Sequence, residues 1–508
     1  MTHRFSFHRR NHQTATITAP NVPAGRATAN PIPPFNLYID QMEVTRPIIV
    51  QKFGGTSIGT GERMLHVADI IQSGLRKHRV IVVVSAMSGT VKGEGTTNLL
   101  LEAGELALNN KPFNVPLKVI EKNHLTAAKT ALTKPRIRSR VEKWLREEMT
   151  WLRSFLVAIR VIRELSPRSQ DILMATGERF SAYLLAAILE QRGRTSSFVD
   201  LIYAVEEKQG TVNPAFFRRV QKTLAGLCAP QADEVPVVTG FFGMVPGGLL
   251  RAVGRGYTDF TAALISAGLG RKVVAEMQVW KEVDGVFTAD PRRVPAARVL
   301  PSISPTEASE LTYFGSEVLH PFTMERVVSA QVPIRIKNTF NPEGEGTVIA
   351  KGKGKRDKRT RASAVTAKEG ITAVTVTSNR MYNAYGFLSG VFNALADHDV
   401  VVDLVSTSEV SISFTVDRRD EIEAAKPALA KLGKVAIAPG RAILAAVGEG
   451  MKYAKGTAGR MFSALGEAGV NIEMISQGAS EINISCVIKE EDVETGLRAV
   501  HRVFLEGE

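Results

Sequence analysis

The chain has 508 residues, which suggests about three domains and gives ample length for large buried cores. Its composition, 44% hydrophobic and 23% charged with only two cysteines, excludes wholesale disorder, a disulfide framework and a structural zinc site. No run approaches the roughly 20 apolar residues of a bilayer span, so we expect no membrane partner and a cytoplasmic protein. Most of the net charge of +13 lies in residues 1–39 and 351–361, which argues against a basic body built for nucleic acid.

Residues 1–45 are expected to form a disordered leader. They are rich in Thr, Asn, Pro and Arg and lack hydrophobic periodicity. Met42 stands just before the first convincing strand, so it competes with Met1 as the start of the protein. The nearly acid-free, Arg-containing composition also resembles an organelle transit peptide, and these alternatives stay open.

Residues 46–350 alternate strand and helix signals. We predict strands at 48–52, 79–85, 197–202 and 236–241, and helices at 62–75, 173–192 and 258–268. The segment from Leu99 to Ser169 is rich in Leu, Lys and Arg and is predicted to be helical throughout. This rhythm favours a mainly parallel sheet covered by helices, hence an α/β/α domain.

A basic linker at 351–364 separates this domain from an internal repeat. The linker run lacks interleaved aromatic residues, which favours a flexible connection over nucleic-acid binding. The repeat matches Phe392, Leu395, Val400 and Ser406 to Phe462, Leu465, Val470 and Ser476, at an offset of 70 residues. Each copy is predicted to run helix, strand, strand, so we expect two small α+β domains at 365–440 and 441–508.

The first candidate site follows the first predicted strand. Here Lys52-Phe53-Gly54-Gly55-Thr56-Ser57 connects a strand to a helix. Glycines let the backbone turn sharply, and the exposed amides at a helix N-terminus favour an anion. Lys52 can reach a phosphate as a point charge. The alternative is a tight structural connection without a ligand, because a Gly-Gly turn alone is a weak signal.

These residues resemble the opening signature of aspartate kinases, within the amino-acid-kinase superfamily. Blocks similar to those of the family follow in its order: Ser85–Ser88 with Gly95–Leu100, Thr176–Arg179, Gly254–Asp259, Val279–Arg292 and Gly315–Pro321. The resemblance covers about residues 47–508 and is closest to the fungal branch. It implies transfer of the γ-phosphate of ATP to the side chain of L-aspartate, giving 4-phospho-L-aspartate. It also implies the first step of threonine and methionine biosynthesis, with lysine biosynthesis open.

The resemblance assigns roles to individual residues. Lys52 and Asp259 are implied to be catalytic, and Ser85, Thr97, Glu178 and Arg255 to bind aspartate. The residues implied to bind ATP are Lys52, Phe53, Gly54, Gly55, Lys281, Glu282, Phe287 and Arg292. In isolation, a surface charge would be the favoured interpretation of Arg255, and a first-turn acid that stabilises a helix N-terminus that of Glu178; the ordered blocks reverse this preference. Mg²⁺ is expected to be held mainly by the nucleotide phosphates.

The implied chemistry agrees with the residue types. An aspartate side chain, with a pKa of about 3.9, is already ionised at neutral pH and needs no strong base. The reaction needs positioning and neutralisation of phosphate charge. Arg255 matches a carboxylate bidentately, and Glu178 can accept from an ammonium. Asp284 and Asp290 serve either the phosphate region or their own turns, and turn capping is favoured.

The two repeats resemble ACT domains, the ferredoxin-like amino-acid-binding modules of biosynthetic enzymes. The implied inhibitor site comprises Gly386, Phe387, Leu388, Asp403 and Ser408 in the first copy and Asn471, Ile472 and Gln477 in the second. The helix opened by Gly386 can take a carboxylate, and Asp403 can pair with an ammonium. The alternative is that both are ordinary turn residues. The resemblance implies threonine as inhibitor, with lysine as the alternative, and a homodimer or larger homo-oligomer.

Two other functions stay open at this level. The first is a kinase of the same fold that phosphorylates glutamate or another carboxylate. The second is a non-catalytic amino-acid sensor that kept the scaffold. The block from Arg255 to Asp259 and the paired ACT units argue against the first function. The presence of Lys52, Glu178 and Asp259 argues against the second.

Overall fold

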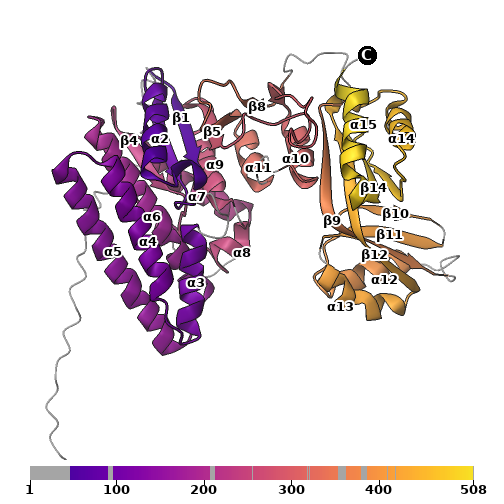
Figure 1. The fold of residues 1–508 in the computed structure, drawn as a ribbon, viewed down its shortest axis with the longest axis horizontal. Coiled ribbons are helices and arrows are strands. Elements are labelled where there is room, and N and C mark those ends of the chain that lie inside the picture. Colours follow the sequence, from indigo (N-terminus) through magenta and orange to yellow (C-terminus); the bar gives the residue numbers. More distant parts are fainter. Residues whose placement is uncertain are drawn as a thin grey trace, which may run out of the picture. The chain divides into compact units, whose positions relative to one another are not determined.

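The computed structural model describes residues 46–89, 95–205, 212–254, 256–316, 319, 321–352, 362–378, 386–408, 410–417 and 419–506. The predicted leader, most of the basic linker and Arg255 lie outside these residues. Residues 45–508 form one compact unit, which contains a mainly parallel sheet and an antiparallel sheet (Figure 1).

The first sheet has eight described strands in the order β3-β4-β2-β1-β5-β7-β8-β6. They are β1 (Ile48–Phe53), β2 (Arg79–Val84), β3 (Ser196–Val199), β4 (Val235–Thr239), β5 (Val274–Lys281), β6 (Ser302–Ile303), β7 (Ile334–Asn338) and β8 (Thr347–Ile349). Every pair from β3 across to β7 is parallel, and only β7 and β8 run antiparallel. The predicted mainly parallel sheet is confirmed.

The central strands are buried along almost their whole length because helices cover both faces of the sheet. All six residues of β1 are buried, as are the five residues after Arg79 in β2. Continuous burial of Val and Ile is typical of parallel strands at the centre of such a sheet. Ile49, Val80 and Val82 pack into one core with the helices of one layer. Helix α9 contacts β1, β2 and β5 and carries α7 and α11 packed against it, which forms the other layer.

The helices of this region are α2 (Gly61–Gly74), α3 (Thr96–Leu108), α4 (Asn114–Ala131), α5 (Pro135–Ile162), α6 (Pro167–Gln191), α7 (Pro214–Cys228), α8 (Leu249–Val253), α9 (Tyr257–Leu269), α10 (Pro305–Tyr313) and α11 (Pro321–Ser329). The helical prediction for residues 99–169 is confirmed by α3, α4 and α5. Ser166, Asn213 and Ser304 each cap a helix that begins with proline, the combination expected at a helix start.

Helix α6 is long and apolar enough, by length and composition alone, to cross a membrane. However, 83% of its most apolar window is buried inside the protein, as in a core helix. The sequence prediction that no run reaches this length underestimated α6, because Thr, Gly, Ser and the adjacent Glu178 and Arg179 interrupt its apolar residues without making it polar overall.

The second sheet is antiparallel throughout, in the order β10-β11-β9-β12-β14-β13. Its elements are β9 (Ala364–Thr377), α12 (Phe387–Ala396), β10 (Val405–Thr407), β11 (Ser411–Val416), α13 (Arg419–Ala430), β12 (Lys434–Val447), α14 (Thr457–Glu467), β13 (Met474–Gln477), β14 (Asn483–Lys489) and α15 (Val493–Leu505). The predicted repeat of helix, strand and strand is confirmed in α12-β10-β11 and α14-β13-β14. The prediction missed one long strand and one further helix in each copy.

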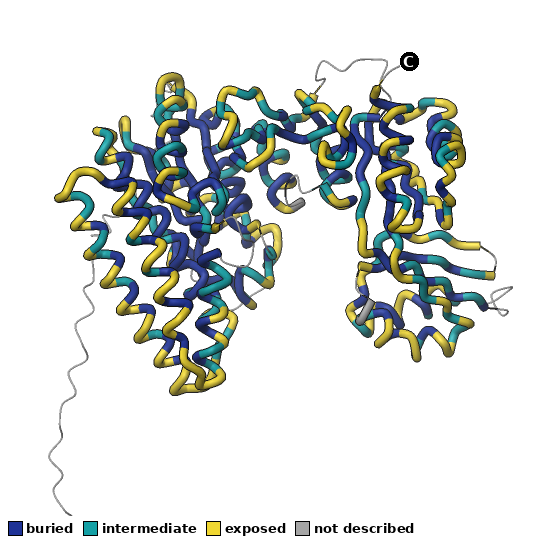
Figure 2. The backbone as a smooth tube through the Cα atoms, viewed as in Figure 1, coloured by how far each residue is buried: buried dark blue, intermediate teal, exposed yellow. Residues whose placement is uncertain are grey.

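The two repeats share their longest strands. The start of β9 pairs with the end of β12 from Arg441 to Val447, whereas the end of β9 pairs with the start of β12 from Lys434 to Ala438. One core lies under α12 and α13 and the other under α14 and α15, at opposite ends of the same two strands. Figure 2 shows that burial changes along these strands, with buried stretches interrupted by exposed residues. The expected division between residues 440 and 441 therefore falls inside β12.

Candidate active site

The carboxyl ends of the central parallel strands meet at one edge of the first sheet. Phe53 at the end of β1 is level with Val84 on β2 and with Trp280 on β5. Val84 is in turn level with Thr239 at the end of β4. The residues that follow these strands are therefore brought together, and in open α/β sheets ligands bind at this edge.

Lys52 and Asp259 form an ion pair at this edge, with 2.8 Å between Nζ and Oδ1. Lys52 is the penultimate residue of β1, and Asp259 lies in the first turn of α9, where a carboxylate interacts favourably with the helix dipole. Only 10% and 12% of the two side chains is exposed. An ammonium has three donors, so this pairing leaves Lys52 able to bind a phosphate oxygen.

The two glycines after β1 face different surroundings. A Cβ at Gly54 would lie 3.7 Å from Lys52 Nζ, which is ordinary contact distance beside the ion pair. A Cβ at Gly55 would lie 2.5 Å from the carbonyl oxygen of Ala86, so Gly55 is needed for two turns to pass closely. Gly55 thus serves the structural connection, and Gly54 borders the space beside Lys52.

A chain of hydrogen bonds lies next to the ion pair. The hydroxyl of Ser85 donates to Thr258 Oγ1 at 3.0 Å, and the hydroxyl of Thr258 donates to Glu178 Oε1 at 3.0 Å. Gly240 permits this approach, because a Cβ there would lie 2.9 Å from Glu178 Oε1. The chain joins the end of β2 to helices α9 and α6. Sequence reasoning missed Thr258, although it stands next to Asp259 in a motif block.

Glu178 is a buried acid in the middle of α6. Its interpretation as a first-turn acid is wrong, because α6 begins at Pro167. Burial raises the pKa of Glu178 to about 8, although the hydrogen bond from Thr258 partly offsets the effect. Its Oε2 has no hydrogen-bond partner among the residues that the structure describes. Without a ligand the side chain is therefore mostly neutral at pH 7.

The remaining predicted aspartate-binding residues are Thr97 and Arg255. Thr97 is half-buried in the first turn of α3. The preceding residue, Thr96, lies so close to Gly177 that a Cβ on Gly177 would be 2.9 Å from Thr96 Cγ2, which brings this turn next to Glu178. Arg255 lies outside the described residues. The structure thus brings Lys52, Asp259, Ser85 and Glu178 together, with Thr97 nearby.

The predicted nucleotide residues are more dispersed. Phe53 is fully buried and stacks on Trp280 with 5.8 Å between ring centroids, so only its backbone could face a nucleotide. Lys281 ends β5, Glu282 is exposed and Phe287 is half-buried in the loop that follows. Sequence reasoning missed Lys337, whose Nζ lies 5.0 Å above the Trp280 ring.

Of the two acids of this loop, Asp290 caps its own turn as predicted, whereas Asp284 is bonded to side chains outside its turn. Asp290 Oδ1 accepts from the backbone of Arg292 at 3.0 Å, and its carboxylate pairs with the Arg292 guanidinium at 2.7 Å. Hydrogen bonds from Arg292 lower the pKa of Asp290. Asp284 accepts from the side-chain amides of Asn338 and Asn341. The Arg292 side chain is 87% exposed and so is free to move. Because its guanidinium is paired with Asp290, it must turn away from that carboxylate to bind a phosphate.

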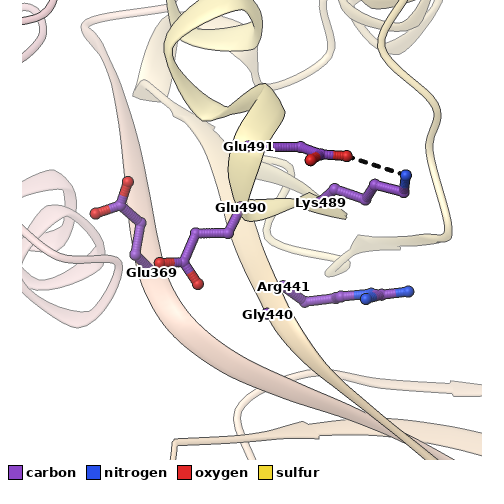
Figure 3. Close-up of a pocket in the computed structure, with 6 residues that line it drawn as sticks. All are labelled: Glu369, Gly440, Arg441, Lys489, Glu490 and Glu491. Atoms are coloured by element: carbon purple, nitrogen blue, oxygen red, sulfur yellow. Dashed lines mark hydrogen bonds and ion pairs between the residues drawn. The ribbon is translucent and has the colours of Figure 1, made fainter.

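A hollow of about 660 Å³ lies elsewhere, on the second sheet (Figure 3). It is lined by Glu369, Gly440, Arg441, Lys489, Glu490 and Glu491. Lys489 pairs with Glu491 at 3.0 Å. The hollow is open and charged, whereas ligand pockets are typically enclosed and mostly apolar. It contains no predicted site residue, so the sheet edge remains the candidate active site.

The predicted inhibitor site centres on Asp403, which precedes β10. Its Oδ1 pairs with Lys368 Nζ at 2.9 Å, and Lys368 also pairs with Asp417 at 2.7 Å. Only 4% of the Asp403 side chain is exposed, and its pKa is raised by burial and by Asp417. Tyr313 of α10 lies beside it, and burial together with the Asp403 charge raises the pKa of Tyr313 to about 12.

The other predicted inhibitor residues lie around the outer strands of this sheet. Gly386, with φ of 90°, precedes Phe387 and Leu388 in the first turn of α12. Ser408 bonds to Ser411 in the turn between β10 and β11. Asn471 and Ile472 precede β13, and Gln477 ends it. Strands β10 and β13 contact each other, so one chain already brings the two predicted halves close together.

Comparison with known proteins identifies the class of protein to which the chain belongs. Residues 47–338, more than half of the chain, match the model of the amino acid kinase family, and residues 374–431 and 444–504 match the ACT domain. The parallel sheet with its charged edge and the paired ACT units therefore define a phosphotransferase of the amino acid kinase type with C-terminal ACT domains.

Individual relatives narrow the family. The aspartokinase of Schizosaccharomyces pombe is 43% identical over 485 residues, covering 90% of this chain and 93% of that protein. The aspartokinase of Saccharomyces cerevisiae is 42% identical over 491 residues, with 90% and 92% covered. Escherichia coli aspartokinase III, solved with aspartate and ADP, aligns with a TM-score of 0.68 at 28% identity, covering 90% and 99%. The chain belongs to the aspartokinases, the aspartate kinases, and the predicted family and fold are confirmed.

Proposed function

We propose that this protein transfers the γ-phosphate of ATP to the side-chain carboxylate of L-aspartate, giving 4-phospho-L-aspartate and ADP. The observation that carries the proposal is the buried Lys52–Asp259 ion pair beside the chain Ser85–Thr258–Glu178 at the carboxyl edge of the sheet. The E. coli relative solved with aspartate and ADP supports the same pair of ligands.

Lys52 and the amides of Gly54 and Gly55 stabilise the charge on the transferring phosphoryl group. A carboxylate oxygen of aspartate forms a bond to the γ-phosphorus while the bond to the bridging oxygen of ADP breaks. No proton has to move, so catalysis consists of positioning and electrostatic stabilisation. Asp259 keeps the Lys52 ammonium directed along the sheet edge.

The metal is proposed to be Mg²⁺ held mainly by the nucleotide phosphates, where it neutralises phosphate charge. The donor set fits this arrangement, because Asp259 is paired with Lys52 and Asp290 with Arg292, and Glu178 is assigned to the substrate ammonium. Within the described ranges, no group of three or more His, Cys, Asp or Glu side chains has a metal-binding arrangement. Lys281, Glu282, Phe287 and Arg292 are proposed to line the nucleotide site.

The amino-acid end of the substrate is held by two charged groups. Arg255 takes the α-carboxylate, and ionised Glu178 accepts from the α-ammonium through its unpartnered Oε2. Ser85 and Thr97 add hydrogen bonds. Because Glu178 is mostly neutral without ligand, binding of the ammonium form releases a proton.

The ACT units are proposed to bind threonine, the end product of the pathway, and to inhibit the enzyme. Asp403 pairs with the inhibitor ammonium, and the first turn of α12 with its carboxylate. The proposed role is the first step of threonine and methionine biosynthesis, with lysine biosynthesis open, in a cytoplasmic homodimer or larger homo-oligomer. The E. coli relative solved with lysine and aspartate supports an amino-acid effector.

The test is to trap the product with hydroxylamine, which converts an acyl phosphate to a hydroxamate. Aspartate and glutamate are compared as acceptors, each with and without threonine and lysine. We expect hydroxamate from aspartate alone and less of it with threonine. Equal turnover of glutamate would reject the proposed acceptor, and no hydroxamate at all would reject the activity.

A further inference from the structure

The last turn of α15 reaches the loop that carries the proposed nucleotide residues. His501 is fully buried, and its Nε2 lies 2.9 Å from the hydroxyl of Thr288, the residue after Phe287. On its other side, His501 Nδ1 lies 2.9 Å from a carboxylate oxygen of Glu506. A residue of the second ACT unit is therefore bonded to the nucleotide loop.

Thr288 is the point where this loop is fixed. Its backbone N–H donates to the carbonyl of Arg298 at 2.9 Å, and its carbonyl accepts from Val365 on β9 at 2.8 Å. Its Oγ1 accepts from the backbone of Arg298 at 3.0 Å. Both ring nitrogens of His501 have a partner, Thr288 at Nε2 and Glu506 at Nδ1, so the imidazole is held on both sides.

The loop is also part of the second ACT core. Ala289 and Val294 pack in the same apolar cluster as Leu497 and Val500 of α15. Arg298 donates to the carbonyl of Leu505 at 2.8 Å, and Arg498 donates to the carbonyl of Arg293 at 2.9 Å. These contacts hold the loop from Thr288 to Arg298, a stretch that directly follows Phe287 and contains Arg292.

We propose that His501 is a positioning residue for ATP: it fixes Thr288, and through it the loop that presents Phe287 and Arg292. The proposal rests on the nucleotide role assigned to this loop under the proposed function. It makes the second ACT unit a structural part of the ATP site, so that a shift of α15 changes nucleotide affinity directly.

The experiment uses the full chain and four substitutions. His501→Leu and Thr288→Val remove the bond, whereas His501→Gln and Thr288→Ser keep a polar atom in its place. We expect the first two to raise both the KM and the Kd for ATP about fivefold to tenfold, the size expected for one buried hydrogen bond, with the KM for aspartate unchanged. His501→Gln and Thr288→Ser should stay within about twofold of the unchanged protein.

Val500→Ala is the matched control, because it loosens the same core without touching the bond. An ATP affinity in His501→Leu equal to that of the unchanged protein overturns the proposal, and so does an equal loss in Val500→Ala. Calorimetric binding of ATP is measured beside turnover. If the unchanged protein binds ATP but does not phosphorylate aspartate, the proposed function fails while the positioning of ATP is still tested.

Discussion

In the proposed mechanism, Lys52 is the residue on which phosphoryl transfer depends most directly. Lys52→Ala removes the cation beside the transferring phosphate and should lower kcat on the order of 100-fold or more, with a small change in the KM for aspartate. Steady-state hydroxamate formation measures both quantities. Because the change also leaves Asp259 buried without its partner, Lys52→Ala/Asp259→Asn is the control for lost stability. Near-normal kcat in Lys52→Ala would remove this residue from the proposed role.

If Glu178 binds the substrate ammonium as proposed, aspartate binding should depend on pH. Burial raises the pKa of Glu178 from 4.5 to about 8. The ligand-free side chain is therefore mostly neutral below about pH 8 and ionises as the pH rises past that value. The substrate ammonium favours the ionised form, so kcat/KM for aspartate should rise between about pH 6 and pH 8. Calorimetry at pH 7 in buffers of different ionisation enthalpy should show proton release on binding. Glu178→Gln should abolish that release, and an unchanged proton count in this variant would contradict the assignment.

The raised pKa of Glu178 also makes the stability of the folded protein depend on pH. A carboxyl whose pKa is raised in the fold penalises the folded state increasingly as pH rises from 4.5 to about 8. Bound aspartate supplies the missing opposite charge. Stabilisation by aspartate should therefore be larger at pH 8 than at pH 6.

At the scale of elements, the turn after β1 separates a packing role from a ligand role. Gly55→Ala would place a Cβ 2.5 Å from a backbone oxygen and should cost about 1–3 kcal/mol of unfolding free energy. The Cβ of Gly54→Ala would meet Lys52 Nζ at 3.7 Å and the carbonyl oxygen of Trp280 at 4.0 Å, both ordinary contacts, so the change should leave thermal stability nearly unchanged and raise the KM for ATP. Equal destabilisation by both changes would contradict this division.

The strand–turn–helix pattern was enough to predict this part of the fold. The apolar runs of β1 and β2, each followed by glycine or small polar residues, predict parallel strands, and the motif blocks fall at the strand ends. Thr258 could not be predicted as the link between Ser85 and Glu178, because a threonine at a helix start is usually a local feature. Its partners are 173 and 80 residues away in the chain, and only the folded sheet brings them together.

The long strands β9 and β12 were missed for a different reason. Each passes from one core to the other, so its pattern of buried residues changes along its length. The alternative that Glu178 is a first-turn acid fails because the polar residues Arg168 to Asp171 hide the true beginning of α6. The pairing of Asp403 with Lys368 depends on contacts across the sheet that the sequence spacing does not reveal.

At the scale of the whole molecule, the proposed regulation depends on Asp403. Asp403→Ala should leave activity at high threonine close to that without threonine, because the inhibitor ammonium loses its partner. Asp417→Ala is the matched control, because it removes the other carboxylate bound to Lys368. The Asp417 side chain is 54% exposed, and the Asp417→Ala protein should still be inhibited by threonine. Hydroxamate formation is measured for both variants at increasing threonine concentrations. Full inhibition of the Asp403→Ala protein would show that the inhibitor site lies elsewhere.

Strands β9 and β12 also limit how such a protein can be rebuilt. Each strand belongs half to one ACT unit and half to the other, so no peptide bond separates the two units cleanly. A hybrid that exchanges one unit for that of a relative must join foreign halves within two paired strands. Transplanting effector specificity should therefore succeed when residues 362–506 are exchanged as a block together with the matching loop around Thr288.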